Sequence, residues 1–259
     1  SDVCSSDLAS NAYKAFESQS TKNQLIYEKC QPLTNAQSGI NFDNELTDDI
    51  KMVNVNSTLH WGQKYEPLSV KIYEHMYNTK IEDFGCIQDE DYIFLGASPD
   101  GINTDINSPR YGRMLEIKNI VNREIDGIPK KEYWIQMQMQ LETCNLEYCD
   151  FIETRIKEYE DAALYFADTE HQYKGVVLYF IKKMLVKNAL LEQGLSLHDG
   201  QYNVPHYEYM PIQTPDSDVD KWIQETKTRL KSDYVLYKAH YWYLDQISCV
   251  LVQRNREWF

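Results

Sequence analysis

The chain has 259 residues and a mass of 30.5 kDa, and 42% of its residues are hydrophobic, so it can bury a sizeable core and is not expected to be intrinsically disordered. Its 26 basic and 40 acidic side chains give a formal net charge of -14, which argues against a protein that coats nucleic acid by charge alone. No apolar run approaches the ~18 residues of a membrane span, because Lys182 and Lys183 interrupt the best candidate. The six cysteines lack zinc-ligand spacing, which favours free thiols in a reducing, intracellular compartment.

The first eight residues, Ser1 to Leu8, have neither the basic start nor the apolar stretch of a signal peptide. Back-translated, they resemble a common sequencing-adapter oligonucleotide read through in frame, so residues 1–8 are expected to be a non-native leader rather than a disordered natural terminus. The missing initiator Met and the abrupt end at Phe259 predict a fragment truncated at both ends. Since no repeat or linker divides the rest, residues 9–259 are expected to form a single domain.

Up to about residue 77, the sequence predicts two helices separated by a long polar loop. Residues 12–29 could form a first helix, and an Asn- and Asp-rich stretch to about residue 56 is expected to be mostly loop. Ser57 or Thr58 can then cap a helix that runs to about Tyr77. Its apolar stripe at helical spacing consists of Trp61, Tyr65, Leu68 and Ile72. Pro67 inside this helix predicts a kink next to Glu66.

The rest of the pattern predicts one mixed α/β domain. Strands are expected at residues 84–88, 92–97 and 113–119, as a meander joined by a turn at 89–91 and a loop at 103–112. A helix at 130–143 and a strand at 148–156 follow. Beyond them we expect strands at 176–181, 207–212 and 247–253, and a helix at 217–231. These elements predict a central mixed sheet flanked by helices.

A strand with the sequence Leu-Glu-Ile-Lys carries the first candidate residues. Because side chains alternate along a strand, Leu115 and Ile117 are expected to face the core, while Glu116 and Lys118 point together to the other side. A carboxylate and an ammonium then share one small patch. Taken alone, this pattern is also what any half-exposed strand displays.

A second acid, Asp100, lies 16 positions earlier in the turn-forming run Ser-Pro-Asp-Gly. An ordinary turn is one reading of that run. The separation also lets the chain finish one strand, turn and return antiparallel, which can bring Asp100 close to Glu116. Two such carboxylates repel each other unless a divalent cation bridges them. Oxygen ligands without His or Cys favour Mg²⁺ or Mn²⁺ over zinc.

Two helices contribute further candidates. Glu66 lies beside Pro67 on the first of them, and Gly62 one turn earlier would let another backbone or a ligand approach closely. On the second helix, Tyr133 and Gln136 lie one turn apart and could hydrogen-bond to a phosphate or orient a water molecule. Each residue also fits an ordinary polar helix face.

Together these blocks resemble the PD-(D/E)XK nucleases, and within them the lambda-exonuclease or YqaJ-type viral recombinase group. Residues 98–101 are similar to the motif that bears the Asp, residues 116–118 to the E-x-K motif, residues 61–66 to the helix motif that ends in Glu, and residues 133–138 to the Tyr and Q-x-Q helix. The resemblance covers about residues 58–154 in the family's order. One departure is Asn119, where Cys-Pro is often found after E-x-K.

The resemblance implies a restriction-endonuclease-like fold with a one- or two-metal phosphodiesterase site. Its metal ligands would be Asp100, Glu116, the backbone carbonyl of Ile117 and, directly or through water, Glu66. Lys118 would orient or help to deprotonate the attacking water and stabilise charge on the phosphorane. Gln136 would hold water or the scissile phosphate.

The function expected from the resemblance is a Mg²⁺- or Mn²⁺-dependent exonuclease that degrades linear duplex DNA from its ends in viral or phage-type recombination. It would lie in the cytoplasm or nucleus of the host cell, with a single-strand annealing protein as partner and a homotrimer as assembly. The stretch 171–191 contains four lysines, 174, 182, 183 and 187, and no acid until Glu192, so with Tyr133 and Gln136 it could face DNA; a solvated helix face fits equally well. A restriction-type endonuclease and a non-catalytic DNA-binding recombination accessory are the alternatives.

Overall fold

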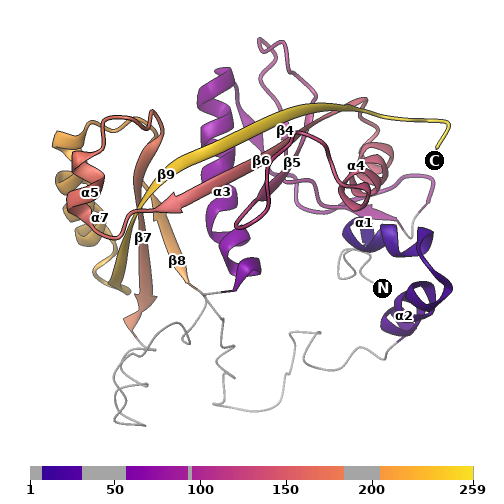
Figure 1. Ribbon diagram of the computed structural model, residues 1–259, viewed down its shortest axis with the longest axis horizontal. Coiled ribbons are helices and arrows are strands. Elements are labelled where there is room, and N and C mark those ends of the chain that lie inside the picture. Colours follow the sequence, from indigo (N-terminus) through magenta and orange to yellow (C-terminus); the bar gives the residue numbers. More distant parts are fainter. Residues whose placement is uncertain (1–7, 31–56, 93–94, 184–204, 259) are drawn as a thin grey trace, which may run out of the picture.

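The computed structural model describes residues 8–30, 57–92, 95–183 and 205–258. Its helices lie beside one large sheet (Figure 1), and two short strands form a second, small sheet. The helical elements are α1 (Leu8–Asn11), η2 (Ala12–Phe16), α2 (Gln19–Cys30), α3 (Thr58–Tyr77), α4 (Lys131–Thr143), α5 (Ala162–Ala167), η3 (Asp216–Asp218) and α7 (Val219–Leu230). The strands are β1 (Ile81–Glu82), β2 (Ile87–Gln88), β3 (Gly96–Ala97), β4 (Gly101–Asn103), β5 (Met114–Asn119), β6 (Tyr148–Glu158), β7 (Lys174–Lys182), β8 (His206–Tyr209) and β9 (Tyr234–Gln253).

The large sheet has seven strands in the order β1-β4-β5-β6-β9-β7-β8. Only β5 and β6 are parallel neighbours; every other adjacent pair in the described sheet is antiparallel. The parallel pair is joined through α4, because a connection between parallel strands must cross the sheet. The expected α/β architecture, a mixed central sheet with flanking helices, is confirmed.

Helices α3 and α4 cover opposite faces of the sheet, which the alternation along β5 makes clear. Leu115 and Ile117 are buried in a cluster with Tyr73 of α3. Met114, on the same strand, is instead buried with Met137 of α4. The middle of the sheet is therefore enclosed on both sides, so even polar residues of β5 are withdrawn from water.

The other end of the sheet has its own core. The helices α5 and α7 lie against β7 and β9 at the end of the molecule away from α4 (Figure 1). Three buried apolar residues of β7, Val176, Leu178 and Phe180, form this core together with Tyr165 of α5 and Ile223 of α7. The small helix α5 is not among the helices that periodicity predicts, since it has only six residues.

Helix α3 begins and packs as predicted. The hydroxyl of Ser57 accepts a hydrogen bond from the backbone N–H of His60 at 3.1 Å, which makes Ser57 the N-cap residue. On the predicted stripe, Tyr65, Leu68 and Ile72 are fully buried. Trp61 is partly buried and packs against the same cluster.

The strands before β5 differ from the prediction. Where strands were expected at residues 84–88 and 92–97, the described residues contain only the two-residue strands β2 and β3, which form a separate small sheet. The meander next to β5 is made by β1 and β4, neither of which was predicted. These strands have two and three residues, too few for a period-2 pattern to show in the sequence.

The remaining elements follow the prediction with changed ends. The helices predicted at 130–143 and 217–231 and the strands at 148–156, 176–181 and 207–212 are confirmed as α4, α7, β6, β7 and β8. The strand predicted at 247–253 is the end of the 20-residue β9. The first helix is split into η2 and α2. The predicted polar loop, from residue 30 to about residue 56, lies outside the described residues except for Cys30, the last residue of α2.

Most of the described cysteines are free thiols, as expected from the sequence. Cys30, Cys144, Cys149 and Cys249 are free thiols, whereas Cys86 is disulfide-bonded, so the expectation of free thiols throughout is wrong at that residue. Within the described parts of the chain, no helix combines the length and apolar character needed to cross a membrane.

Candidate active site

Strand β5 brings Glu116 and Lys118 together on the face that α4 covers. Glu116 has no solvent-exposed surface, and one of its carboxylate oxygens, Oε1, accepts a hydrogen bond from the ammonium group of Lys118. The predicted pairing of these two side chains on one face is confirmed. That face is not the half-exposed surface of the ordinary alternative, because α4 lies over it.

A glutamine of α4 holds the other oxygen of Glu116. Gln140 Nε2 donates to Glu116 Oε2 at 3.0 Å and to the backbone carbonyl of Ser98 at 3.4 Å. Gln140 is itself 1% exposed. Both oxygens of the buried carboxylate are therefore bound, and its orientation is set from β5 on one side and from α4 on the other.

Asp100 lies directly before β4, whose first residue, Gly101, pairs with Leu115 of β5. Its Oδ2 accepts the backbone N–H of Ile117 at 2.6 Å. Because the β4 ladder ends at Gly101, the side chain of Asp100 supplies the acceptor that a longer strand would have offered to Ile117. This bond places the Asp100 carboxylate beside the E-x-K segment, as the sequence predicted.

Glu66, the third acid, reaches the same region from α3. Glu66 and Asp100 both line a cavity of about 330 Å³ between α3 and the segment that contains β1. Its other lining residues are Pro67, Val70, Lys71, Glu74, Ile81 and Asp83. Three further carboxylates thus lie around Asp100 in or beside this cavity: Glu66, Glu74 and Asp83.

The pKa values of Glu66 and Asp100 are affected by the neighbouring carboxylates as well as by burial. The pKa of Asp100 is raised well above its usual range, first by burial and then by the charges of Glu116 and Glu66. The pKa of Glu66 is raised by burial and by Glu116, against the opposing effect of Lys118. Crowded carboxylates favour protonation unless a cation compensates for their charge.

Lys118 balances part of this negative charge. Burial alone would lower the pKa of its ammonium group, but the neighbouring Glu116 and Asp100 raise that pKa above its ordinary value. The ammonium also lies 5.1 Å from the centre of the Tyr133 ring. Lys118 therefore remains charged at neutral pH and acts as a fixed point charge between the acids and α4.

The chemistry of these donors fits a hard divalent cation. Glu66, Asp100 and Glu116 offer only oxygen, and the charge repulsion that adds to burial in raising the pKa values of Glu66 and Asp100 is the repulsion that such a cation removes. Within the described residues, however, no group of three His, Cys, Asp or Glu side chains already has the arrangement of a metal site. The two oxygens of Glu116 are hydrogen-bonded instead, as described above.

The other predicted site residues make fewer direct contacts with the three acids. Tyr133 lies beside Lys118, and Gln136 lies half-buried on the same helix, where Gln140 rather than Gln136 donates to Glu116. Ile117 contributes its N–H to Asp100. A Cβ atom on Gly62 would meet no described atom within 4 Å, so no other described backbone segment approaches that side of Gly62; the approach of a ligand there stays a prediction.

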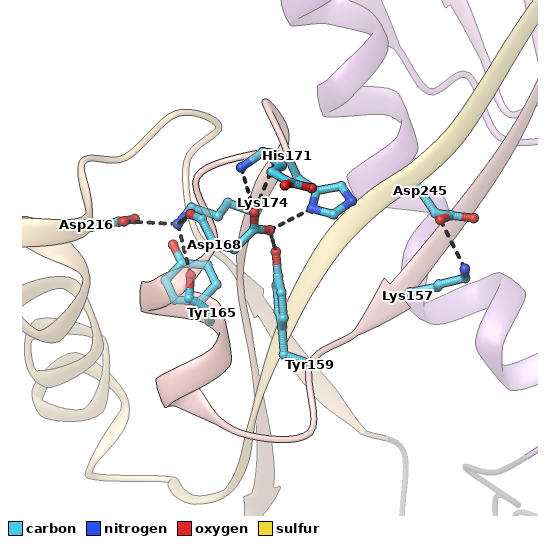
Figure 2. A network of polar contacts seen from close by, with 9 residues as sticks. Lys157, Tyr159, Tyr165, Asp168, His171, Lys174, Asp216 and Asp245 are labelled. Carbon is cyan, nitrogen blue, oxygen red and sulfur yellow. Dashed lines mark hydrogen bonds and ion pairs between the residues drawn. The ribbon is translucent and has the colours of Figure 1, made fainter.

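The predicted DNA-facing lysines belong to β7 and to the residues after it. Lys174 is engaged within the protein: its ammonium donates to the carbonyl oxygens of Tyr165 at 2.9 Å and Asp168 at 2.8 Å and forms an ion pair with Asp216 at 3.0 Å (Figure 2). Lys182 and Lys183 are exposed, and Lys183 donates to the carbonyl of Lys231. Lys187 lies outside the described residues.

Sequence reasoning missed Gln140 as a site residue. It shares a helix face with Tyr133 and Gln136, and its i, i+4 spacing from Gln136 was the available signal. Gln138, two residues from Gln136, does not share that face and bonds to the carbonyl of Gln253.

Comparison with curated proteins finds one significant relative. The uncharacterized protein R354 of Acanthamoeba polyphaga mimivirus is 29% identical over 231 residues, which cover 79% of this chain and 41% of that protein. The chain thus spans less than half the length of this relative.

Solved structures of an alkaline exonuclease, LHK-Exo from Laribacter hongkongensis, are distantly similar in shape. One has a TM-score of 0.40 and 19% identity and covers 86% of this chain and 83% of its own. The other, a complex with dAMP, has a TM-score of 0.39 and 17% identity and covers 86% of this chain and 92% of its own.

The family match covers more than half of the chain and includes most of the site. The YqaJ-like viral recombinase domain matches residues 3–147, a range that contains Glu66, Asp100, Glu116, Lys118 and the whole of α4. The chain belongs to the YqaJ-like viral recombinase domain family.

Proposed function

We propose that this chain is a divalent-metal-dependent deoxyribonuclease that hydrolyses phosphodiester bonds at the ends of linear duplex DNA during recombination. The observation that carries the proposal is the convergence of Asp100, Glu116 and Lys118 at the junction of β4 and β5. Membership of a family described as viral recombinase domains supports a role in DNA recombination.

The metal ligands in this proposal are Asp100, Glu116 and the carbonyl of Ile117, with Glu66 serving directly or through water. A bound Mg²⁺ or Mn²⁺ supplies a Lewis acid that neutralises charge on the phosphodiester and lowers the pKa of water. The backbone N–H of Ile117 orients the carboxylate of Asp100 by a hydrogen bond. The side-chain amide of Gln140 orients the carboxylate of Glu116 in the same way.

Lys118 provides the cationic group. Its ammonium lies between the carboxylates and the start of α4, where it can orient the attacking water and stabilise the negative charge that develops on the phosphorane. Gln136 has no hydrogen bond described within the protein and is free in this proposal to hold water or the scissile phosphate. Tyr133 adds a hydroxyl on the same helix.

The proposed substrate is a duplex end, with an annealing protein as partner and a homotrimer as the assembled form. Lys182 and Lys183 are the exposed cations proposed to contact DNA outside the site. A restriction-type endonuclease would use the same residues but cut internally. A non-catalytic accessory would have no use for converging acids, two of which, Glu66 and Asp100, have pKa values raised by burial and by the neighbouring carboxylates.

End-labelled linear duplex DNA and covalently closed circular DNA, incubated with Mg²⁺ or Mn²⁺, test the proposal. We expect the linear DNA to be shortened from its ends and the closed circle to survive. Chelation by EDTA should stop the reaction, and Mg²⁺ or Mn²⁺ should restore it. Rapid linearisation of the circle would favour the endonuclease, and restoration by Zn²⁺ alone would contradict the oxygen-ligand site.

Three variants connect activity to the site. Asp100→Asn, Glu116→Gln and Lys118→Met should each abolish cleavage, because each removes a charge used in the reaction. Asp100→Asn should keep the thermal stability of the metal-free protein, since an amide oxygen can still accept the N–H of Ile117 while the carboxylate repulsion disappears. Wild-type cleavage rates in Glu116→Gln or Lys118→Met would refute the assignment.

A further inference from the structure

Tyr133, in the first turn of α4, is surrounded by three cationic side chains. Lys118 Nζ lies 5.1 Å from the centre of its ring, the guanidinium carbon of Arg123 5.8 Å and Lys130 Nζ 6.0 Å. The ring also contacts Phe151 of β6, with 5.9 Å between ring centres, and is held against the sheet. Arg123 and Lys130 thus lie around the same ring as Lys118.

The loop that carries Arg123 is fixed to the sheet at several points. Just after β5, the N–H of Ile120 donates to the carbonyl of Thr154 at 2.7 Å. Arg155 of β6 donates to the carbonyl of Arg123 itself. Further on, Gln246 of β9 donates to the carbonyl of Ile125 at 3.1 Å. The backbone of Arg123 is therefore held next to Lys118 by contacts from two strands.

A buried carboxylate orients the Arg123 side chain. Glu153 of β6 is 0% exposed and forms an ion pair with Arg123 Nη2. In the parallel ladder Glu153 stands directly opposite Lys118. Arg123 Nη1 donates to the carbonyl of Glu124 at 3.1 Å, and 26% of the Arg123 side chain stays exposed. Because a guanidinium has five N–H donors, Arg123 keeps donors for a further acceptor.

The start of α4 adds to the same positive region. Lys130 is the N-cap residue and makes no side-chain capping bond; its ammonium lies 3.9 Å from Glu132 of the first turn, and its side chain is 48% exposed. The N-terminus of a helix carries partial positive charge, and anions are favoured beside it. A planar guanidinium and an exposed ammonium next to such a helix start are suited to a phosphate group.

We infer that Arg123, Lys130 and Tyr133 form a binding site for a phosphodiester group of the DNA strand next to Lys118, and that Glu153 is the positioning residue that aims Arg123. The inference rests on the proposed function for the identity of the strand. It assigns the contact to the sugar–phosphate backbone, which carries no sequence information, so the site binds every sequence alike.

Binding without cleavage tests this site. A fluorescein-labelled linear duplex is titrated with protein in EDTA at several NaCl concentrations, and affinity is followed by fluorescence anisotropy. Arg123→Gln is combined with Glu153→Gln, so that no buried carboxylate is left without its partner. Lys130→Gln changes an exposed residue and so preserves the fold. Arg229→Gln on α7, whose side chain is 59% exposed and pairs with Glu208, is the matched control.

We expect the Arg123/Glu153 double variant and Lys130→Gln each to weaken binding about tenfold and to reduce the slope of log affinity against log salt by about one unit. Arg123→Lys, which keeps the charge but loses the planar fork, should retain the slope and lose part of the affinity. Glu153→Gln alone should weaken binding with both cations intact. Arg229→Gln should leave affinity and slope unchanged.

Affinity and salt slope equal to wild type in the folded Arg123 and Lys130 variants would overturn the phosphate site, as would a wild-type protein that does not bind DNA. Cleavage with Mg²⁺ or Mn²⁺ is measured separately. A wild-type protein that binds DNA through Arg123 but never cleaves it would contradict the proposed nuclease and leave the phosphate site standing. If the wild type cleaves DNA but the Arg123 variants bind it as tightly as wild type does, the nuclease proposal stands and the phosphate site is contradicted.

Discussion

Glu116 is a fully buried carboxylate whose two oxygens are held by different elements. Lys118 binds one oxygen from the same strand, and Gln140 binds the other from α4. A buried carboxylate without such partners would be costly, so these contacts both permit its burial and set its direction. The side chain of Gln140 also has a buried oxygen, Oε1, for which the described residues provide no hydrogen-bond partner.

Replacing Gln140 should therefore impair catalysis through Glu116. In Gln140→Leu we expect kcat for DNA cleavage to fall by about 10- to 100-fold, because residues that orient a metal ligand have effects of this size. KM for DNA should change little, and the Mg²⁺ concentration for half-maximal activity should rise. Steady-state cleavage of linear duplex at varied DNA and Mg²⁺ concentrations measures all three.

Gln138→Leu is the control on the same helix. Gln138 is also buried, but it bonds to the carbonyl of Gln253 at 3.0 Å and accepts the N–H of Asn255 at 2.7 Å, away from Glu116. This variant should lose stability and keep its cleavage rate. Equal losses of activity in both variants would mean that Gln140 acts only by packing α4.

At the scale of elements, Gly101 and Gly62 differ in the space around the position where a side chain would begin. A Cβ on Gly101 would lie 2.3 Å from Cγ2 of Ile81, so the close pairing of β4 with β1 depends on glycine. Gly62 lies inside α3 with open space around the position of its missing Cβ, and its carbonyl accepts a hydrogen bond from Asn119 at 3.1 Å. Only the first glycine is required by packing.

We expect Gly101→Ala to lower the free energy of unfolding by about 1–3 kcal/mol, because β1 or Ile81 must shift to make room. Gly62→Ala should raise it by about 0.5–1 kcal/mol, since alanine restricts the unfolded chain and favours the helix. Urea unfolding of both variants measures the difference. Destabilisation by Gly62→Ala would show that another segment of the chain occupies this space.

At the scale of the molecule, Glu158 links α3, β6 and β9. From β6, its Oε1 accepts from Lys64 at 2.6 Å and from Tyr65 at 2.5 Å, both on α3. Its Oε2 bonds to His240 of β9 at 2.9 Å. Burial lowers the pKa of Lys64 to about 8 against the opposing pull of Glu158. The cluster thus joins a helix to two strands of the sheet through one carboxylate.

This cluster should make stability depend on pH in the acid range. Burial would raise the pKa of Glu158, but His240 and Lys64 outweigh it and hold that pKa well below the usual 4.5. A lowered folded-state pKa contributes stability that is present above the unfolded value and is lost as pH falls toward the folded one. Glu158→Gln should therefore cost about 3 kcal/mol near pH 7 and less at pH 3.

Chemical unfolding of wild type and Glu158→Gln between pH 7 and pH 3 measures this difference. Glu90→Gln, at an exposed position, is the control and should show no pH-dependent difference from wild type. A Glu158→Gln cost that stays constant across this range would show that the carboxylate contributes by shape rather than by charge.

The spacing of residues in the sequence was enough to predict the longer helices and the strand that carry the site residues. The stripe of α3 with its Ser57 cap, the alternation that pairs Glu116 with Lys118, and the helix that carries Tyr133 could all be read from residue spacing. These elements are long enough for periodicity to accumulate, and each buries one face or one stripe of side chains. The resemblance to a nuclease family rested on the same segments.

Contacts between distant segments decided the rest. The three-residue strand β4 forms by pairing with β5, and the two-residue strand β1 by pairing with β4, so no local sequence pattern predicts either strand. Glu116 is buried because α4 lies over β5, and that contact selects Gln140 from three glutamines on one helix. Burial, partner choice and charge repulsion depend on distances across the fold, which sequence spacing does not contain.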